Sequence, residues 1–317
     1  MHDQWLSRQL LPPRRDLSVA EVVRDAGWIH TAGGTGVHLS LRARTQRPIA
    51  DVLELPAVRE SMMLVHPDDA SLALAAARRT FADRFRKLDV DAAEIDRLAE
   101  RVAAVIGDAT LSIDEIRSEV PSRSLGEPGR KLGLTSTLVV AVRIAQLNGL
   151  IVRAGENRYR RAPFKIRDIA DVDRQLAKRF VQWASPTSAD EFAAWAGISK
   201  RDARAALEGL SGAPASPPAR ASGTFFLPFR DNYTWFHRLE PTHHHAIVID
   251  GEVAGWFEFD GERVIWRLKN GKRPREVAQS AAELESWIRE ELGDLKHYAA
   301  DNEKNRAARV AFVKGES

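Results

Sequence analysis

The sequence contains no cysteine. This absence excludes disulfide scaffolds, thiolate metal sites and cysteine nucleophiles, and it fits a reducing compartment. No apolar run approaches the ~18 residues of a membrane-spanning helix. The first residues, MHDQWLSRQLLPPRRD, lack the apolar core of a secretory signal. We therefore expect a cytoplasmic protein with no membrane partner.

The remaining composition is that of a globular chain with an uneven distribution of charge. Of the 317 residues, 44% are hydrophobic and 29% are charged, which suits two or three domains. The net charge is only +3 although the pI is about 9.2. Between residues 143 and 167 the only acid is Glu156. The basic residues of this window are Arg143, Arg153, Arg158, Arg160, Arg161, Lys165 and Arg167.

The central region, residues 109–167, has the element order of a winged helix-turn-helix. A helix over 111–120 is predicted, with Ser112 and Glu115 in capping-box spacing. A polar loop follows, then an apolar helix over 135–149 and a basic hairpin. That second helix is too apolar to read bases, so we predict a structural role for most of it.

The flanking regions predict further helices and strands. Expected helices cover residues 17–26, 67–86, 91–106, 168–184, 188–196, 199–210 and 281–293. Expected strands cover residues 37–44, 224–229, 245–250, 252–259 and 262–268. The predicted fold class is mainly α with β-hairpins (α+β), with tandem winged helix-turn-helix domains and a β-rich C-terminal part. The expected domains are residues 1–108, 109–167 and 168–317.

The basic hairpin indicates binding to double-stranded DNA. Arginine at this density neutralises phosphates and releases counterions, which gives sequence-independent affinity. A solvated strand face is the alternative interpretation. The expected DNA-binding residues are His38, Arg59, Arg143, Arg153, Arg158, Tyr159, Arg160, Arg161 and Lys165.

Three other features give weaker signals. The loop TAGGTG, residues 31–36, lacks the lysine of a phosphate loop, so its glycines are interpreted as allowing close backbone approach to DNA. Residues 243–245 are three consecutive histidines, which alternate between the faces of a strand. We therefore expect no metal and no cofactor. Asp231 either positions a water or caps a turn, and the sequence leaves both readings open.

Several segments resemble a known family. One runs from Pro186-Thr187 through Phe192 and Trp195 to Gly197-Ile198-Ser199. Others are the Leu-Pro-x-x-Asp-x-Tyr segment at 227–233 and the Asp-Gly hairpin at 250–255. Residues 58–69 look like a degraded Arg-Gly-Thr-Leu-His segment, altered here to Arg-Glu-Ser-Met-Met. Together these segments resemble the AlkZ/YcaQ-like winged-helix DNA glycosylases.

The resemblance implies a concave, basic DNA-binding surface. It also implies excision of alkylated bases, or unhooking of crosslinks, by hydrolysis of the N-glycosidic bond. The family's catalytic Gln-x-Gln or Gln-x-Asp motif aligns with His30-Thr31-Ala32. The candidate catalytic residues are therefore His30, which would hold a water through a neutral ring nitrogen, and Asp231, which would supply negative charge near the sugar.

Three functions remain open at this point. The chain is either a DNA glycosylase active in DNA repair or a non-catalytic DNA-binding protein, such as a lesion sensor or regulator. A third reading is a module whose winged helices bind a protein partner. We expect a monomer in the cytoplasm, associated with the nucleoid.

Overall fold

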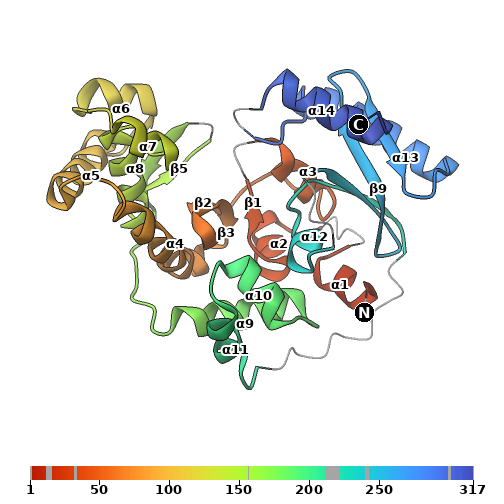
Figure 1. Ribbon diagram of the computed structural model, residues 1–317, viewed down its shortest axis with the longest axis horizontal. Coiled ribbons are helices and arrows are strands. Elements are labelled where there is room, and N and C mark those ends of the chain that lie inside the picture. The colour runs from red at the N-terminus through yellow and green to blue at the C-terminus, as the bar shows by residue number, and fades with distance from the viewer. Residues whose placement is uncertain are drawn as a thin grey trace. The chain divides into compact units, whose positions relative to one another are not determined.

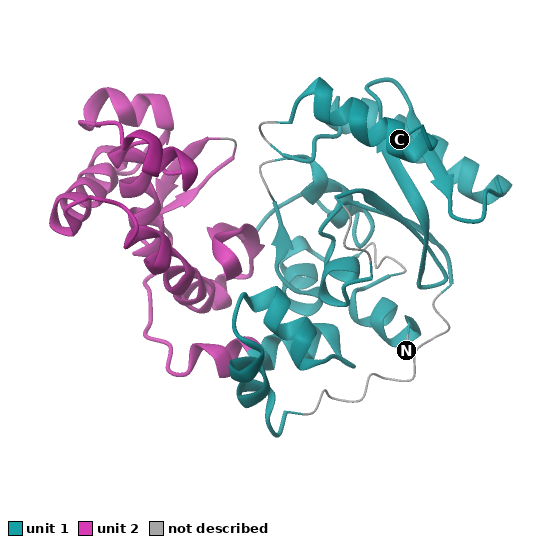
Figure 2. Cartoon of the chain, in the orientation of Figure 1, with its two compact units in different colours: residues 1–51, 177–317 teal, residues 52–176 magenta. Residues whose placement is uncertain are grey.

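The computed structural model describes residues 2–11, 16–31, 34–155, 157–210, 222–239, 243–298 and 301–316. The chain forms two compact units, shown in Figure 2. Unit 1 combines Met1–Asp51 with Ala177–Ser317, and unit 2 is Val52–Leu176. The three domains expected from the sequence, and their boundaries, stay a prediction.

Unit 2 is built from helices and short antiparallel strands. Its strands follow the order β3-β2-β5-β6-β4. The strands are β2 (Leu53–Pro56), β3 (Met62–Val65), β4 (Thr110–Ser112), β5 (Ile151–Arg153) and β6 (Arg158–Arg161). The helices are η1 (Val58–Glu60), η2 (Pro67–Asp69), α4 (Ala70–Phe85), α5 (Ala92–Ile106), α6 (Ile113–Glu119), α7 (Gly126–Lys131) and α8 (Thr137–Leu147).

The winged helix-turn-helix predicted for the central region is present in unit 2. Helix α6 begins at a complete capping box between Ser112 and Glu115. Strand β6 pairs with β5 on one side and β4 on the other, forming the wing. Helix α8 is buried along most of its length, with Leu138 and Ala141 in the core of the motif. Its role is structural, as its apolar sequence predicts.

Unit 1 contains a four-stranded antiparallel sheet of order β10-β9-β8-β7 (Figure 1). Its strands are β7 (Thr224–Leu227), β8 (His245–Ile249), β9 (Glu252–Phe259) and β10 (Val264–Leu268). Alternate side chains point to opposite faces. Ile247 and Phe257 pack under α13 (Arg275–Trp287), which continues as a π-helical turn, η3 (Ile288–Leu292). The other face meets α1 (His2–Arg8) and α14 (Glu303–Lys314).

Unit 1 also contains further helices and an aromatic cluster. These helices are α2 (Val19–Ala26), α3 (Gly36–Arg42), α10 (Ala189–Ala196), α11 (Lys200–Leu207), α12 (Asn232–Phe236) and the part of α9 (Val172–Ala184) from Ala177 onward. The rings of Phe180 and Trp195 stack with centroids 5.1 Å apart, and Trp183 and Phe236 lie beside them. These aromatics belong to the core, as their helical spacing predicts.

Two local predictions were wrong. Residues 37–44 were expected to form a strand, but they contain helix α3. Helical geometry places Ser40 and Arg44, four residues apart, on one side of the chain, where both bind the carboxylate of Asp231. The expected loop after α6 contains the short helix α7, which Glu127 and Arg130 support through an ion pair one turn apart.

Most of the remaining predictions are confirmed. Capping boxes start α2 at Ser18 and α10 at Ser188, and Gly197 ends α10 in the left-handed conformation. The predicted linker after α11 lies mainly outside the described residues, since 211–221 are not among them. Among the described residues, no helix is both long enough and apolar enough to cross a membrane.

Candidate functional site

The wing of unit 2 exposes basic side chains. In strand β6, Arg158 and Arg160 lie on one face, because alternate residues of a strand share a face. Tyr159 lies on the other face and packs, half-buried, against the winged-helix core. Arg161, at the end of β6, and Lys165 are also exposed. The exposed face of the wing therefore presents cations with the aromatic ring turned inward.

Several wing cations already have an acidic neighbour. Arg153 lies 3.5 Å from Glu54, and Arg161 lies 3.4 Å from Asp108. Arg158 lies 3.8 Å from Glu115 and donates to the carbonyl of Thr110. Within the described part of the chain, Arg160 and Lys165 make no ion pair. The wing is thus a partly compensated basic surface.

The remaining residues expected to bind DNA lie in different surroundings. Arg143 of α8 is half-buried, with one nitrogen 3.5 Å from the sulfur of Met62. Burial lowers the pKa of Arg143, while the charge of Glu60 opposes that shift. Arg59 is exposed in unit 2, whereas His38 is exposed on helix α3 of unit 1.

The altered Arg-Glu-Ser segment adopts a conformation that favours glycine. Arg59 and Glu60 both have positive φ, 55° and 56°. The side chain of Glu60 is buried and lies 2.6 Å from Arg84. Burial raises the pKa of Glu60, while the charges of Arg84 and Arg143 oppose that shift. The glutamate at position 60 therefore holds a local ion pair.

His30, at the end of strand β1 (Ile29–His30), has a defined hydrogen-bonding state. Its Nε2 lies 3.0 Å from a guanidinium nitrogen of Arg230. A guanidinium only donates, so Nε2 must accept and the ring proton must be on Nδ1. Burial, and then the charge of Arg230, lower the pKa of His30 to about 3. The ring is therefore neutral at physiological pH.

This state limits what His30 can do to a water molecule. The lone pair of Nε2 is taken by Arg230, and Nδ1–H can donate a hydrogen bond but cannot accept a proton. Trp235 approaches the ring edge-on, with centroids 5.8 Å apart. His30 can therefore orient a water or a base, but it cannot act as a general base while Arg230 holds it. Sequence reasoning missed Arg230, which adjoins Asp231 in the chain.

The glycine-rich loop after His30 is fixed by the segment that precedes α14. Thr35 N donates to the carbonyl of Lys296 at 3.0 Å, and Lys296 N donates to Thr35 Oγ1 at 2.7 Å. A Cβ atom at Gly34 would lie 2.3 Å from that carbonyl. Gly34 thus allows close approach of the chain's own backbone. Ala32 and Gly33 lie outside the described residues.

Asp231 lies in a buried ion pair rather than in an open site. Its side chain has no exposed surface, and its two oxygens lie 2.8 and 2.9 Å from nitrogens of Arg44. It also accepts from Ser40 Oγ and, at 3.0 Å, from the backbone of Tyr233, so that it caps α12. Both carboxylate oxygens therefore have hydrogen-bond partners within the protein. Of the two readings that the sequence left open, this arrangement matches the one in which Asp231 caps a turn.

The segments that carry the family resemblance contact one another. Tyr233 donates its hydroxyl to the carbonyl of Gly251 at 2.5 Å, which joins the Leu-Pro-x-x-Asp-x-Tyr segment to the Asp-Gly hairpin. Asp250 accepts from the backbone of Gly223 at 3.0 Å. Trp195 and Phe192 pack in the aromatic cluster. In unit 1, these residues therefore act as scaffold.

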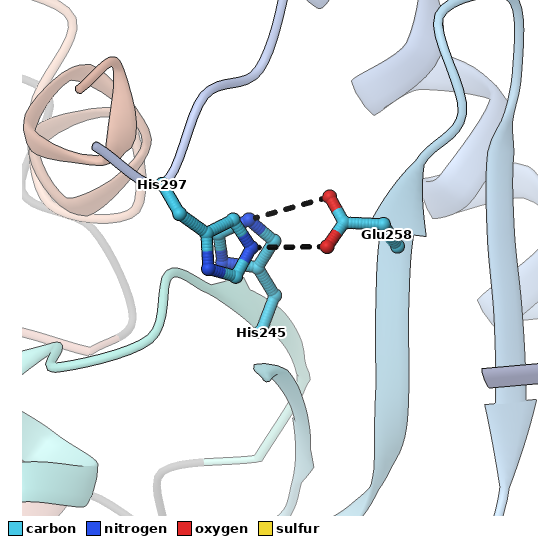
Figure 3. A group of neighbouring side chains, drawn as sticks. All are labelled: His245, Glu258 and His297. Atoms are coloured by element: carbon cyan, nitrogen blue, oxygen red, sulfur yellow. Dashed lines mark ion pairs between the residues drawn. The ribbon is translucent and has the colours of Figure 1, made fainter. Parts of the chain in front are cut away.

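Figure 3 shows a second group of titratable side chains, His245, Glu258 and His297, all buried. Their ligand atoms lie within 4.8 Å of one another, a spacing that a metal ion could bridge. Sequence reasoning missed this group because its members come from β8, β9 and the segment before α14. Burial lowers the pKa of His245 well below its usual value and that of His297 to about 3.

The hydrogen bonds of this group do not fit a metal. The backbone N–H of Phe229 donates to His245 Nδ1 at 2.9 Å, so the proton of the neutral ring is on Nε2, the nitrogen that faces Glu258. A metal on Nε2 would need a proton on Nδ1, which would then oppose another N–H. Arg309 already binds Glu258 at 2.6 Å. The cation of this cluster is therefore an arginine.

Comparison with known proteins places the chain in a family. The model of the DNA glycosylase AlkZ-like family matches residues 37–240, more than half of the chain. The chain belongs to this family. A search of curated proteins gave no match. The matched range begins after His30, so the aligned catalytic position lies outside it.

A solved structure with a similar fold is the Streptomyces sahachiroi DNA glycosylase AlkZ. It has a TM-score of 0.63 and 16% sequence identity, and the similarity covers 90% of this chain and 94% of that one. The predicted α+β fold and the family resemblance are thus confirmed.

The buried pair gives a stability prediction. Replacing Asp231 with Asn should lower the free energy of unfolding by about 3–5 kcal/mol, because the charge of Arg44 remains buried without its partner. The measurement is a urea unfolding curve. Asp108→Asn, which removes the exposed partner of Arg161, is the control and should cost at most about 1 kcal/mol. Equal losses in the two variants would contradict the prediction.

The state of His30 is open to NMR. The imidazole ¹⁵N shifts should show the Nδ1–H form, with a pKa of about 3. Arg230→Gln should raise this pKa because it removes the nearby positive charge, but the pKa should stay below 6.5 because burial is the larger cause. A ring that gains its second proton near pH 6.5 in the unaltered protein would refute the assignment.

Proposed function

We propose that this protein binds duplex DNA through the wing of its central winged helix. Membership of the AlkZ-like family makes DNA the expected partner. The observation that carries the proposal is the exposed row of cations on β6 and after it, of which Arg160 and Lys165 have no acidic partner in the described part of the chain. Contacts of this kind bind phosphates without reading sequence.

The burial of α8 also supports the proposal that the wing, and not this helix, contacts DNA. A helix-turn-helix protein that reads bases places exposed polar residues of its second helix in the major groove. Here that helix is in the core, and its Gln146 is only 3% exposed. Affinity would then come from the wing, and selectivity would come from the lesion or from DNA shape. Alkylated or crosslinked duplexes in the nucleoid are the targets that the family resemblance suggests.

Salt-dependent binding to a labelled duplex tests the proposal. Serine at Arg158, Arg160 and Arg161 should lower the magnitude of the slope of log K against log salt by about 2 to 3, since each lost phosphate contact contributes about 0.9. The control has serine at Arg86, Lys87 and Arg97, which are all exposed. Arg86 and Lys87 directly follow α4, and Arg97 lies on α5. This control changes the charge equally and should leave the slope unchanged. Salt-insensitive binding by the unaltered protein would rule the proposal out.

Hydrolysis of an N-glycosidic bond is the second candidate function, and the position of His30 favours it. The ring is neutral, partly accessible and held in one tautomer by Arg230. An alkylated purine is already a cationic leaving group, so its release needs little proton transfer. His30 would orient the attacking water by donation from Nδ1. The charge of Arg230 opposes an oxocarbenium-like sugar, which predicts slow turnover.

The activity test uses single-turnover conditions with excess protein and a duplex carrying an N7-alkylated guanine. If His30 contributes, abasic sites should form above the spontaneous rate. His30→Ala should then reduce that rate by about 100-fold, the lower end of the range for one positioned catalytic group. His243→Ala, an exposed histidine outside the candidate site, is the control. Binding without any abasic product would identify the non-catalytic alternative, a lesion sensor or regulator.

A further inference from the structure

A second basic segment lies in unit 1. Residues 263–275, RVIWRLKNGKRPR, include six cations and no acid. The cations are Arg263, Arg267, Lys269, Lys272, Arg273 and Arg275. The segment begins in strand β10 and ends at the first residue of α13, so the connection between them is short. Its cation density equals or exceeds that of the wing.

The connection from β10 to α13, here called the basic turn (residues 269–275), is ordered and exposed. Lys269 N donates to the carbonyl of Ala254 at 2.8 Å, which ties the turn to β9. Asn270 Oδ1 accepts from the backbone of Lys272 at 2.9 Å. Gly271 has φ of +70° and open space around it. The basic side chains of the turn all reach solvent.

The cations of the basic turn differ from those of the wing in their partners. Within the described part of the chain, Lys272, Arg273 and Arg275 form no ion pair or side-chain hydrogen bond. In the wing, by contrast, Arg158 and Arg161 each have an acidic neighbour. Uncompensated like charges repel one another, so a concentrated group of them marks a surface that meets an anion.

Two aromatic rings hold cations of the turn in place. The guanidinium of Arg273 lies over the ring of Trp266, 5.4 Å from its centroid. The ammonium of Lys269 lies 5.3 Å from the centroid of Trp256. A guanidinium that stacks on a ring keeps its edge nitrogens free to bind a phosphate. Arg273 is therefore prepared for an anion with little loss of side-chain entropy.

We propose that the basic turn is a second DNA-backbone contact, which binds phosphates of the duplex through Lys272, Arg273 and Arg275. This inference rests on the proposed function, because it assigns a further surface to the same partner. It adds a contact from unit 1, the unit that holds His30. The turn would therefore fix DNA against the candidate active unit independently of the wing in unit 2.

The test measures duplex binding by full-length protein against salt concentration. Serine at Lys272, Arg273 and Arg275 should weaken binding about tenfold or more at 100 mM salt and lower the magnitude of the slope by about 2 to 3. The variant with Lys272→Arg, Arg273→Lys and Arg275→Lys keeps the charges and should retain the slope. The triple serine variant at Arg86, Lys87 and Arg97 controls for net charge.

Each outcome decides between the two proposals. If the wing variant weakens binding and the basic-turn variant does not, the turn contact is wrong and the proposed function stands. If the turn variant weakens binding and the wing variant does not, the turn contact stands and the wing assignment fails. Absence of duplex binding by the unaltered protein overturns both. Unchanged duplex binding with weakened polyglutamate binding would mean that the turn takes an acidic protein, which also overturns the proposal.

Discussion

The buried ion pair between Arg44 and Asp231 is the interaction on which unit 1 depends. It joins the turn that follows α3 to the residue that caps α12, and both side chains are fully buried. An unpaired charge at that depth would be strongly destabilising, so neither residue can be placed there without the other. The pair also fixes the backbone at residue 231. The next residue toward the N-terminus, Arg230, holds the proton of His30 on Nδ1.

The parts of the fold that the sequence predicts are those set by local interactions, whereas this ion pair joins distant segments. Capping boxes at Ser18, Ser112 and Ser188 start three helices, because the spacing of serine and glutamate is a local signal. The alternation in residues 37–44 misled because its cause is not local. Ser40 and Arg44 are buried although they are polar, because both bind a carboxylate about 190 residues away in sequence.

The same reasoning applies to the candidate site. Cation density in the sequence located the wing, but it did not show that Arg158 and Arg161 have acidic neighbours. The histidine run at 243–245 suggested no common ligand geometry, yet His245 lies beside Glu258 of β9 and His297 of the segment before α14. Contacts between segments that are distant in sequence determine both the neighbours of the wing arginines and the surroundings of His245. The density of arginine and lysine in the sequence therefore gives only the total number of positive charges. The structure shows which of these charges have no acidic neighbour.

The contact between Tyr233 and Gly251 bears on how such proteins diversify. The side chains by which this chain resembles its family hold segments of the fold together. A lineage that keeps this framework can replace the groups around its substrate and still fold. Similarity detected through these framework residues therefore identifies a common architecture, and the reaction of each protein has to be measured on that protein.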